Sequence, residues 1–287
     1  MDKIKSPTPI AILMATYNGE PYLKEQLDSL LKQTHRQWTL YIHDDGSTDG
    51  TLNLLRQYAS QYDNIRILDY PSQKGAKNNF LSLLQRVEAR YYMFCDQDDV
   101  WLKDRIAISL EEIELQESRY STEKPIIVYN DLHVTDANLR ILYDSFWQEI
   151  CVHPEFLTTF DEVAGCIPVT GCAMIFNHRS KESVVFPAPL ATMHDAWITC
   201  CTLKNGGIIH PIHQQLILYR QHQANSVGAE DLNHIDLAYR ITHFGEMQGK
   251  NWRQYRMMRS LGYGSIFKFF RYKWLYKKRI QNKIRAK

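Results

Sequence analysis

Short apolar runs alternate with helix-like segments through the first hundred residues, and this alternation limits the folds that the chain can adopt. Four of the runs have the length of buried strands: residues 9–15, 38–43, 65–68 and 91–95. The segment after the first run carries leucines at helical spacing, namely Leu23, Leu27, Leu30 and Leu31. Strands that alternate with helices form right-handed parallel crossovers, which bring the C-terminal ends of the strands to one edge of a sheet. We therefore predict an α/β fold around a mostly parallel sheet flanked by helices.

A polar turn follows three of these strands at the shared edge. The turns are Thr16–Asn18, Asp44–Ser47 and Asp96–Asp99. In open α/β sheets the ligand crevice lies outside this edge, so we expect the three turns to converge on one site. No GxGxxG or Walker motif follows any of the strands. Phosphates bound there must then be held by a metal ion and by side chains.

The third turn, Asp96-Gln97-Asp98-Asp99, places three carboxylates side by side. Like charges this close repel and raise one another's pKa, so such a cluster usually persists because a cation neutralises it. The alternative is a solvated loop that caps a helix beginning near Leu102. Because a second acidic turn follows another strand at 44–50, we favour a hard divalent ion that carries a phosphate-bearing substrate.

Three motifs, in this order and spacing, resemble the nucleotide-binding half of family 2 glycosyltransferases with the GT-A fold: Met14–Gly19, Asp44–Asp49 and Asp96–Trp101. The resemblance covers roughly residues 8–225. The residue sequence of the third motif resembles that of a rhamnosyltransferase-like branch of the family. Three later features also resemble that branch, namely Met193–Trp197, Tyr219–His222 and Asn225. That branch builds bacterial surface polysaccharides.

The resemblance implies a GT-A catalytic domain at residues 1–228. Its nucleotide half would span about 8–100 and its acceptor half about 101–228. A C-terminal helical extension would follow at 229–287, beginning with a linking helix at 230–250.

The resemblance also implies a set of residues that bind the nucleotide or the donor sugar: Thr16, Tyr17, Asn18, Asp44, Asp45, Lys77, Asn79, Asp96, Gln97 and Arg220. Among them, Asp44 would accept a hydrogen bond from the pyrimidine N–H while Asp45 steadies the turn. A second interpretation stays open for this pair, because Asp-Gly is a strong turn signal in any fold. For Lys77 and Asn79 the alternative is a solvated basic loop.

A metal ion, Mg²⁺ or Mn²⁺, would by the same resemblance bind Asp98 and Asp96, with His222 as an additional ligand. Hard oxygen ligands suit these ions, and few protein ligands are needed when phosphates and waters fill the remaining positions. The ion would act as a Lewis acid on the leaving diphosphate. For Arg220 and His222, surface positions on an edge strand are the alternative.

Inverting transfer by direct displacement needs a carboxylate that takes the proton of the acceptor hydroxyl. Asp195 is the candidate, since it follows a strand-like run at 171–176 and precedes an apolar segment at 196–203 that we predict to be a helix. In the family an acidic residue at the start of such a helix is the base. A helix N-cap is the alternative role. Three residues are expected on the acceptor side: Trp101, His194 and Trp197.

These features together predict an inverting, metal-dependent enzyme that transfers a single sugar. The donor expected from the resemblance is dTDP-rhamnose, and the acceptor is a saccharide or lipid-linked saccharide of cell-surface polysaccharide synthesis. A processive synthase would carry a QxxRW motif and flanking transmembrane helices, and the sequence shows neither. A UDP-hexose or UDP-N-acetylhexosamine is the alternative donor, and a noncatalytic nucleotide-binding protein is the alternative class.

Residues 253–287 hold 12 of the 34 lysines and arginines and none of the 32 acids. Aromatic residues interleave with these cations, which is typical of segments that lie in a membrane interface. We predict that residues 251–287 form two helices separated at Gly262–Ser265 and that they bind an anionic membrane surface. Packing on the acidic catalytic body is the second alternative. Nucleic-acid binding ranks last, because no nucleic-acid motif accompanies the segment.

The expected location is the cytoplasm, at the inner face of the cell membrane. The N-terminus lacks an apolar leader, and no run reaches the ~18 apolar residues of a membrane span. The six cysteines form no CxxC pair and lie mostly in apolar runs, which is typical of reduced core thiols.

Overall fold

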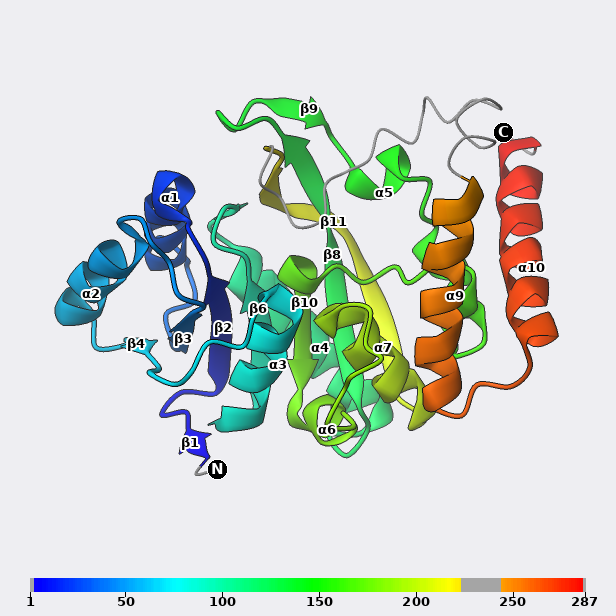
Figure 1. The fold of residues 1–287 in the computed structure, drawn as a ribbon, viewed down its shortest axis with the longest axis horizontal. Helices are drawn as coiled ribbons and strands as arrows, with labels where there is room; N and C mark the ends of the chain where they lie inside the picture. Colours follow the sequence, from blue (N-terminus) through cyan, green and yellow to red (C-terminus); the bar gives the residue numbers. More distant parts are fainter. Residues whose placement is uncertain (1–2, 223–243, 286–287) are drawn as a thin grey trace.

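The computed structural model describes residues 3–222 and 244–285 as one large sheet with helices on both of its faces (Figure 1). The strands of this sheet follow one another in the order β4 (Ile65–Ile67), β3 (Trp38–Asp44), β2 (Ile10–Thr16), β6 (Tyr91–Cys95), β10 (Met174–Asn177), β8 (Ile126–Thr135), β11 (Ile208–Arg220) and β7 (Val100–Trp101). Strand β9 (Ile141–Tyr143) is added to β8, and β1 (Ile4–Lys5) pairs separately with β5 (Val87–Glu88).

The first four strands of the order form the parallel half of the sheet. Strand β3 pairs in parallel with β4 and β2, and β2 pairs in parallel with β6. The register ends with Thr16 opposite Asp44, so the turns after β2 and β3 leave from the same edge. The predicted α/β alternation of the first hundred residues is confirmed.

Beyond Cys95 the sheet is mixed. Strand β10 runs antiparallel to β6 and β8, and β7 runs antiparallel to β11. The sequence did not indicate β7 or β8, because β7 has two residues and the polar pair Asn130-Asp131 interrupts the apolar pattern of β8. A mostly parallel sheet therefore describes the nucleotide half.

The helices have the following bounds: α1 Glu20–Leu31, α2 Thr51–Gln61, α3 Ala76–Arg86, α4 Arg105–Tyr120, α5 Phe146–Glu149, α6 His178–Glu182, α7 His194–Lys204, α9 Phe244–Ser260 and α10 Ile266–Arg285. Three short 3₁₀ turns lie between them, namely η1 Pro154–Phe156, η2 Glu162–Ala164 and η3 Gly171–Ala173. Helix α4 begins later than predicted, since Val100 and Trp101 first pair with β11. Its predicted N-terminal anion, Asp99, therefore lies before β7 and does not cap α4.

Alternate residues of the central strand β2 face two separate cores. Ala11 and Leu13 belong to the core that includes residues of α3, α7, α9 and α10. Ile10, Ile12 and Met14 belong to the core that includes residues of α1, α2 and α4. A strand buried on both faces has a continuous apolar sequence, which is why residues 9–15 were recognisable as a strand.

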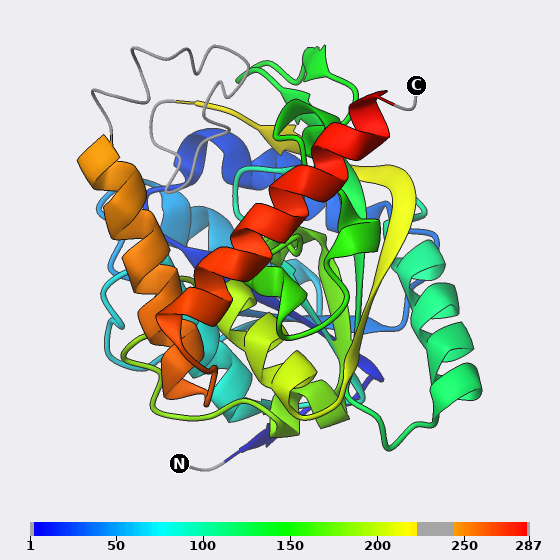
Figure 2. The same ribbon diagram turned by 90° about the vertical axis from the view of Figure 1, so that its right-hand side faces the viewer.

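The C-terminal segment forms two helices, α9 and α10, and the predicted break at Gly262–Ser265 separates them. Helix α10 crosses the side of the molecule that lies farthest from β4 (Figures 1 and 2). Its Phe269 and Tyr276 are buried, and the Tyr276 hydroxyl accepts a hydrogen bond of 3.0 Å from the His153 N–H. One side of α10 therefore packs on the catalytic body.

Some predictions about this region fall on residues that the structure does not describe. The boundary at 228/229, Asn225 and most of the linking helix at 230–250 lie outside the described residues. Among the helices that are described, none is long and apolar enough to cross a bilayer. All six cysteines are free; four are buried, and Cys151 is exposed.

The docking of α10 predicts that substitution of one phenylalanine lowers stability strongly and that substitution of a neighbouring phenylalanine hardly changes it. Phe269 is fully buried, whereas Phe267 is 84% exposed. Phe269→Ala should lower the free energy of unfolding by about 3–5 kcal/mol, because it leaves a cavity under the helix. Phe267→Ala should change it by no more than about 0.5 kcal/mol. Urea denaturation measures both, and equal effects would show that α10 is not docked in this way.

Candidate active site

The turns after β2, β3 and β6 are joined by side-chain hydrogen bonds. Thr16 Oγ1 donates to Asp44 Oδ1 at 2.9 Å. Gln97 joins the third turn to the first, because its Oε1 accepts from the Tyr17 N–H at 2.9 Å and its Nε2 donates to the Tyr17 carbonyl at 3.0 Å. The predicted convergence of the three polar turns at one sheet edge is confirmed.

Asn18 fixes the shape of the first turn. Its φ of 47° lies in the left-handed region, which asparagine tolerates better than most residues. Its N–H donates to Ser47 Oγ at 2.8 Å, and its Oδ1 accepts from the Thr48 N–H at 2.8 Å. The neighbouring Tyr17 is 58% exposed, so its ring lies at the open rim of the site.

Asp44 has the role in the turn that was expected of Asp45. The Asp44 carboxylate accepts from Gly46 N–H, Ser47 N–H, Ser47 Oγ and Thr16 Oγ1, which occupy its four lone-pair sites. Asp44 therefore steadies its own turn. Its contact with the pyrimidine stays a prediction, and such a contact requires one of these bonds to open.

Asp45 instead holds the loop that leads into α3. Its carboxylate accepts from the Ser72 hydroxyl and from the backbone N–H groups of residues 73–75. Burial acts to raise the pKa of Asp45, but these hydrogen bonds, led by that from Gly75, lower it overall. Asp45 is therefore an ionised anchor for the 72–75 loop.

Lys77 and Asn79, the two residues of α3 that were predicted to bind the sugar donor, have different surroundings. Lys77 Nζ donates to the Ala191 carbonyl at 3.2 Å and so ties α3 to the loop before α7. Asn79 is 1% exposed, and its amide bonds the His43 ring and the His43 carbonyl. Asn79 therefore joins α3 to β3 inside the fold, and its contact with the donor stays a prediction.

Asp98 and His222 are brought together from distant parts of the chain. His222 Nε2 lies 2.9 Å from Asp98 Oδ2, and the two side chains are 12% and 19% exposed. The His222 ring also packs on the Tyr22 ring, with 4.5 Å between centroids. An imidazole nitrogen and a carboxylate oxygen thus face each other at the edge where the strands end.

Arg220 is a buried framework residue and not an exposed clamp. It is 2% exposed, and its guanidinium donates to the Asp98 carbonyl at 2.7 Å, to the Ala137 carbonyl and to Glu25. Its Cζ lies 4.6 Å from the centroid of the Tyr22 ring. The predicted contact of Arg220 with the diphosphate stays a prediction. Sequence reasoning missed Glu25 and Tyr22, which lie on one face of α1, because nothing in that helix indicates a distant arginine.

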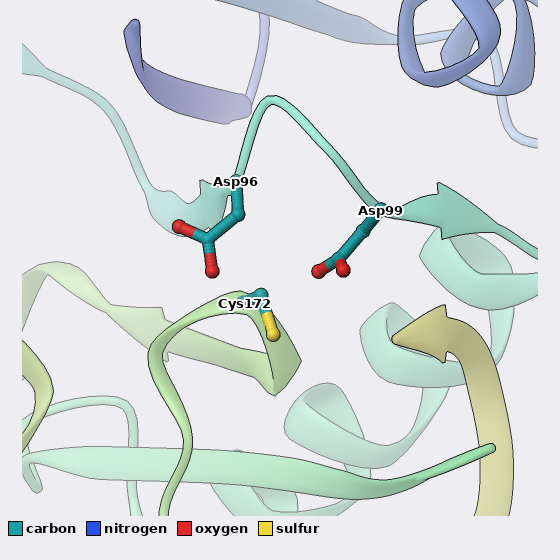
Figure 3. Close-up of side chains that lie close together, drawn as sticks. All are labelled: Asp96, Asp99 and Cys172. Carbon is teal, nitrogen blue, oxygen red and sulfur yellow. The ribbon is translucent and has the colours of Figure 1, made fainter. Parts of the chain in front are cut away.

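Asp96 and Asp99 lie beside the Cys172 thiol, below the loop that carries Asp98 (Figure 3). Burial, followed by the charges of Asp98 and Asp195, raises the pKa of Asp96 to about 7. Burial and the neighbouring charges of Asp98 and Asp96 raise the pKa of Asp99 well above its usual range. Both shifts show that negative charge is unfavourable within this cluster.

Arg105 is a buried cation whose charge acts on the acids of this cluster. It is fully buried, its Cζ lies 3.3 Å from the centroid of the Trp101 ring, and it donates to the Cys172 carbonyl. Burial lowers the pKa of Arg105 to about 10, which still leaves it charged at neutral pH. Arg105 thus offsets part of the charge of Asp99, which sequence reasoning did not anticipate.

Two groups of side chains contain possible ligands for a divalent ion. The groups differ in burial and in the chemistry of their ligand atoms. Asp96, Asp99 and Cys172 lie within 4.8 Å of one another, but burial raises the pKa of the Cys172 thiol, which disfavours the thiolate that binds metals. Asp98 and His222 are partly exposed and offer oxygen and nitrogen ligands at the crevice. The residues of the Asp98–His222 pair fit Mg²⁺ or Mn²⁺ better.

Asp195 lies at the start of α7, close enough to Asp96 for its charge to raise the pKa of Asp96. Its Oδ2 accepts from the Gly171 N–H at 2.9 Å, and its Oδ1 accepts from the Ala196 N–H at 2.6 Å. A Cβ on residue 171 would lie 2.5 Å from His194 Nε2, so a glycine is needed for this approach. The position of Asp195 at the start of a helix is as predicted.

The three residues expected on the acceptor side are buried. Trp101, His194 and Trp197 are 2%, 4% and 3% exposed. Trp101 belongs to the core under α1 and α4, His194 lies between the rings of Phe80 and Phe94, and Trp197 Nε1 donates to the Val185 carbonyl. Their contact with the acceptor stays a prediction. They support the elements that carry Asp98 and Asp195.

Comparisons with known proteins agree with this arrangement. The model of the family "Glycosyl transferase family 2" matches residues 11–171. The chain is 29% identical to the dTDP-rhamnosyl transferase RfbG of Shigella flexneri, over 75% of this chain and 74% of that protein. It is also 29% identical to the UDP-Glc:alpha-D-GlcNAc-diphosphoundecaprenol beta-1,3-glucosyltransferase WfgD of Escherichia coli, over 69% of this chain and 71% of that protein.

A solved structure has a similar fold. The mannosyltransferase PcManGT of Pyrobaculum calidifontis, in complex with GDP-Man and Mn²⁺, has a TM-score of 0.57 and 14% sequence identity, covering 76% of this chain. The present chain spans 58% of the length of that structure. At this identity the similarity concerns the GT-A fold alone. Because the family model covers more than half of the chain, the protein belongs to glycosyl transferase family 2 and is a glycosyltransferase.

Proposed function

We propose that this glycosyltransferase transfers a single L-rhamnose from dTDP-rhamnose, with inversion, to a saccharide or lipid-linked saccharide in cell-surface polysaccharide synthesis. The observation that carries the proposal is the convergence of Asp98, His222, Asp96 and Asp195 at one sheet edge. The similarity to the dTDP-rhamnosyl transferase RfbG supports the choice of donor. The enzyme would work at the inner face of the membrane, where a lipid-linked acceptor is accessible.

The nucleotide would lie along the rim formed by the first two turns. Tyr17 offers an exposed ring there, and the turn of Thr16 and Asn18 is held rigid by its bonds to the Asp44 turn. Rigid turns lose little conformational entropy when a ligand binds, so they favour affinity. Asp45 would act from behind by fixing the loop before Lys77, whose ammonium is near the donor side of α3.

Asp98 and His222 would hold the divalent ion, with Asp96 beneath them. When bound, the ion supplies Lewis-acid stabilisation of the diphosphate leaving group. The chain contributes the placement: Arg220 holds the Asp98 carbonyl and the Asp99 carboxylate through its Nε and its backbone N–H.

Asp195 would accept the proton of the acceptor hydroxyl. Its carboxylate is aimed by two backbone N–H groups, from Gly171 and Ala196, and it lies on a helix rather than on a loop. Such positioning keeps the base within a fixed distance of the reacting hydroxyl. Trp197 and His194, packed below, would hold the first turn of α7 in place.

Asp195→Asn tests the base directly. The amide oxygen still accepts from the Gly171 N–H, so the fold and the nucleotide site should persist, while the proton acceptor is lost. We expect kcat to fall by about a hundredfold to ten-thousandfold with an unchanged KM for the donor. Asp104→Asn, at the start of α4, is the matched control. A variant at Asp195 with full turnover would contradict the proposed base.

Exchange of His222 tests the metal site by a readout other than turnover. His222→Gln should remove most of the Mn²⁺-dependent rise in melting temperature with dTDP, because one of two facing ligands is lost. His210 lies in β11, where it pairs with Glu112 at 3.2 Å, and His210→Gln should behave as the wild type. If both variants keep the Mn²⁺ response, His222 does not ligate the ion.

A thermal-shift panel with dTDP, UDP, GDP, CMP and ADP, each with and without Mn²⁺, tests the donor. A bound nucleotide raises stability by RT ln(1 + [L]/Kd), about 2.7 kcal/mol at a hundredfold excess over Kd. We expect a metal-dependent shift with dTDP. A shift confined to UDP would replace rhamnose by a UDP-hexose or UDP-N-acetylhexosamine, the alternative that the similarity to WfgD supports.

A further inference from the structure

The outward half of α10 carries three large exposed rings. Phe267, Phe270 and Trp274 are 84%, 43% and 58% exposed. Their spacing of three and four residues places them in one stripe along the helix. Figure 2 shows α10 lying across the surface of the molecule, without another described element over it. Exposed rings arranged in a row are unusual on a soluble protein surface and indicate a partner.

The cations of α10 fall into two groups. One group pairs with acids of the catalytic body: Lys268 with Asp161 at 2.6 Å, Arg279 with Glu162 at 2.7 Å, and Lys283 with Glu155. The second group, Arg271, Lys277 and Lys278, is exposed and makes no ion pair with the part of the chain that the structure describes. By helical spacing the second group flanks the rings, and Lys278 Nζ lies 5.0 Å from the centroid of the Trp274 ring.

The inward half fixes the direction in which the stripe faces. Lys273 Nζ donates to the Gly165 carbonyl at 3.1 Å, and burial lowers the pKa of Lys273 to about 8. Gly165 is needed there, since a Cβ at this position would lie 2.8 Å from Tyr276 Cβ. Helix α10 is therefore clamped on the η1–η2 segment by its inward half, and its outward half is held rigidly toward solvent.

We propose that the stripe of Phe267, Phe270 and Trp274, with Arg271, Lys277 and Lys278, docks on an anionic lipid bilayer. The rings would lie at the level of the headgroups and the cations would contact lipid phosphates. Charge complementarity favours this occupant. Arg271, Lys277 and Lys278 are exposed and pair with no acid among the described residues. Lys268, Arg279 and Lys283, by contrast, pair with acids of the body. The inference rests on the proposed function in one respect: docking on the membrane would bring the enzyme to its lipid-linked acceptor.

The docking is that of a folded helix on the catalytic domain and not that of a flexible tail. Because the inward half stays packed, the bilayer would meet the whole domain in one orientation. Helix α10 runs in the same direction as β8 and β11, so its C-terminal end lies toward the edge where Arg220 and the candidate site are found (Figure 1). Membrane binding would therefore hold that edge at a fixed height above the lipid surface.

Sedimentation with vesicles of phosphatidylcholine, with and without phosphatidylglycerol, tests the proposal on the full chain. We expect the wild type to bind only the vesicles that contain phosphatidylglycerol, at about 0.1 M salt. The variant with Arg271→Gln, Lys277→Gln and Lys278→Gln should bind about two orders of magnitude more weakly, because each cation near the surface contributes about a factor of five. The variant with Phe267→Ser, Phe270→Ser and Trp274→Ser should lose binding as well.

Matched controls separate the stripe from net charge and from general apolar surface. Lys24→Gln, Arg56→Gln and Lys103→Gln together remove the same charge from exposed positions of the nucleotide half. Leu115→Ser with Tyr120→Ser removes exposed apolar groups from α4. Both controls should bind vesicles as the wild type does, and all variants should keep the wild-type melting temperature.

Wild-type binding by the two stripe variants, or retention of the wild type by single-stranded RNA but not by vesicles, would overturn the proposal. Donor hydrolysis in the absence of lipid distinguishes its failure from that of the proposed function. A wild type that hydrolyses the sugar nucleotide but ignores vesicles would sink the docking surface alone. Vesicle binding through the stripe without any nucleotide response would leave the docking surface standing and remove the transferase proposal.

Discussion

The candidate site depends on one buried guanidinium. Arg220 ends β11 and is 2% exposed, so each of its N–H groups must find an acceptor or cost stability. The guanidinium donates to the Asp98 carbonyl, the Ala137 carbonyl and Glu25. The backbone N–H of Arg220 donates to the Asp99 carboxylate. The acceptor half of the sheet is thereby joined to the acidic turn of the nucleotide half and to α1. This contact holds the chain two residues before His222 against the turn that carries Asp98.

Acidic side chains are concentrated beneath that contact. Asp96 and Asp99 are held near Asp98 and Asp195, and burial together with mutual repulsion raises the pKa of both Asp96 and Asp99. Arg105 offsets part of this charge from within the core. A crevice of this kind attracts a cation, and a cation in turn attracts a diphosphate. The arrangement therefore gives a physical reason for the absence of a glycine-rich phosphate loop.

The sequence indicated the parallel half of the sheet because strands buried on both faces are continuously apolar and end in polar turns. The sequence could not indicate which polar side chains make their hydrogen bonds within the fold and which remain available to a ligand. Asp44 and Asp45 look alike in the sequence, yet one binds its own turn and the other binds a loop nearly thirty residues away. Trp101 and Trp197 follow motif residues directly, but each side chain points into a core. Adjacency to a motif does not determine the direction of a side chain.

The C-terminal helix illustrates the same limit. Its interleaved rings and cations were evident from the sequence, but the division into a paired inward half and an unpaired outward half depends on acids far away in the chain, at Glu155, Asp161 and Glu162. Both sequence interpretations, packing on the body and docking on a membrane, are therefore compatible with one helix. The structure assigns packing to the inward half.

The most direct test of the central claim is the position of Mn²⁺ in crystals grown with dTDP, located by anomalous scattering. The account predicts one peak within coordination distance of the Asp98 carboxylate and the His222 imidazole, next to the diphosphate. A peak among Asp96, Asp99 and Cys172 with His222 turned away, or a nucleotide bound without any ion, would contradict it.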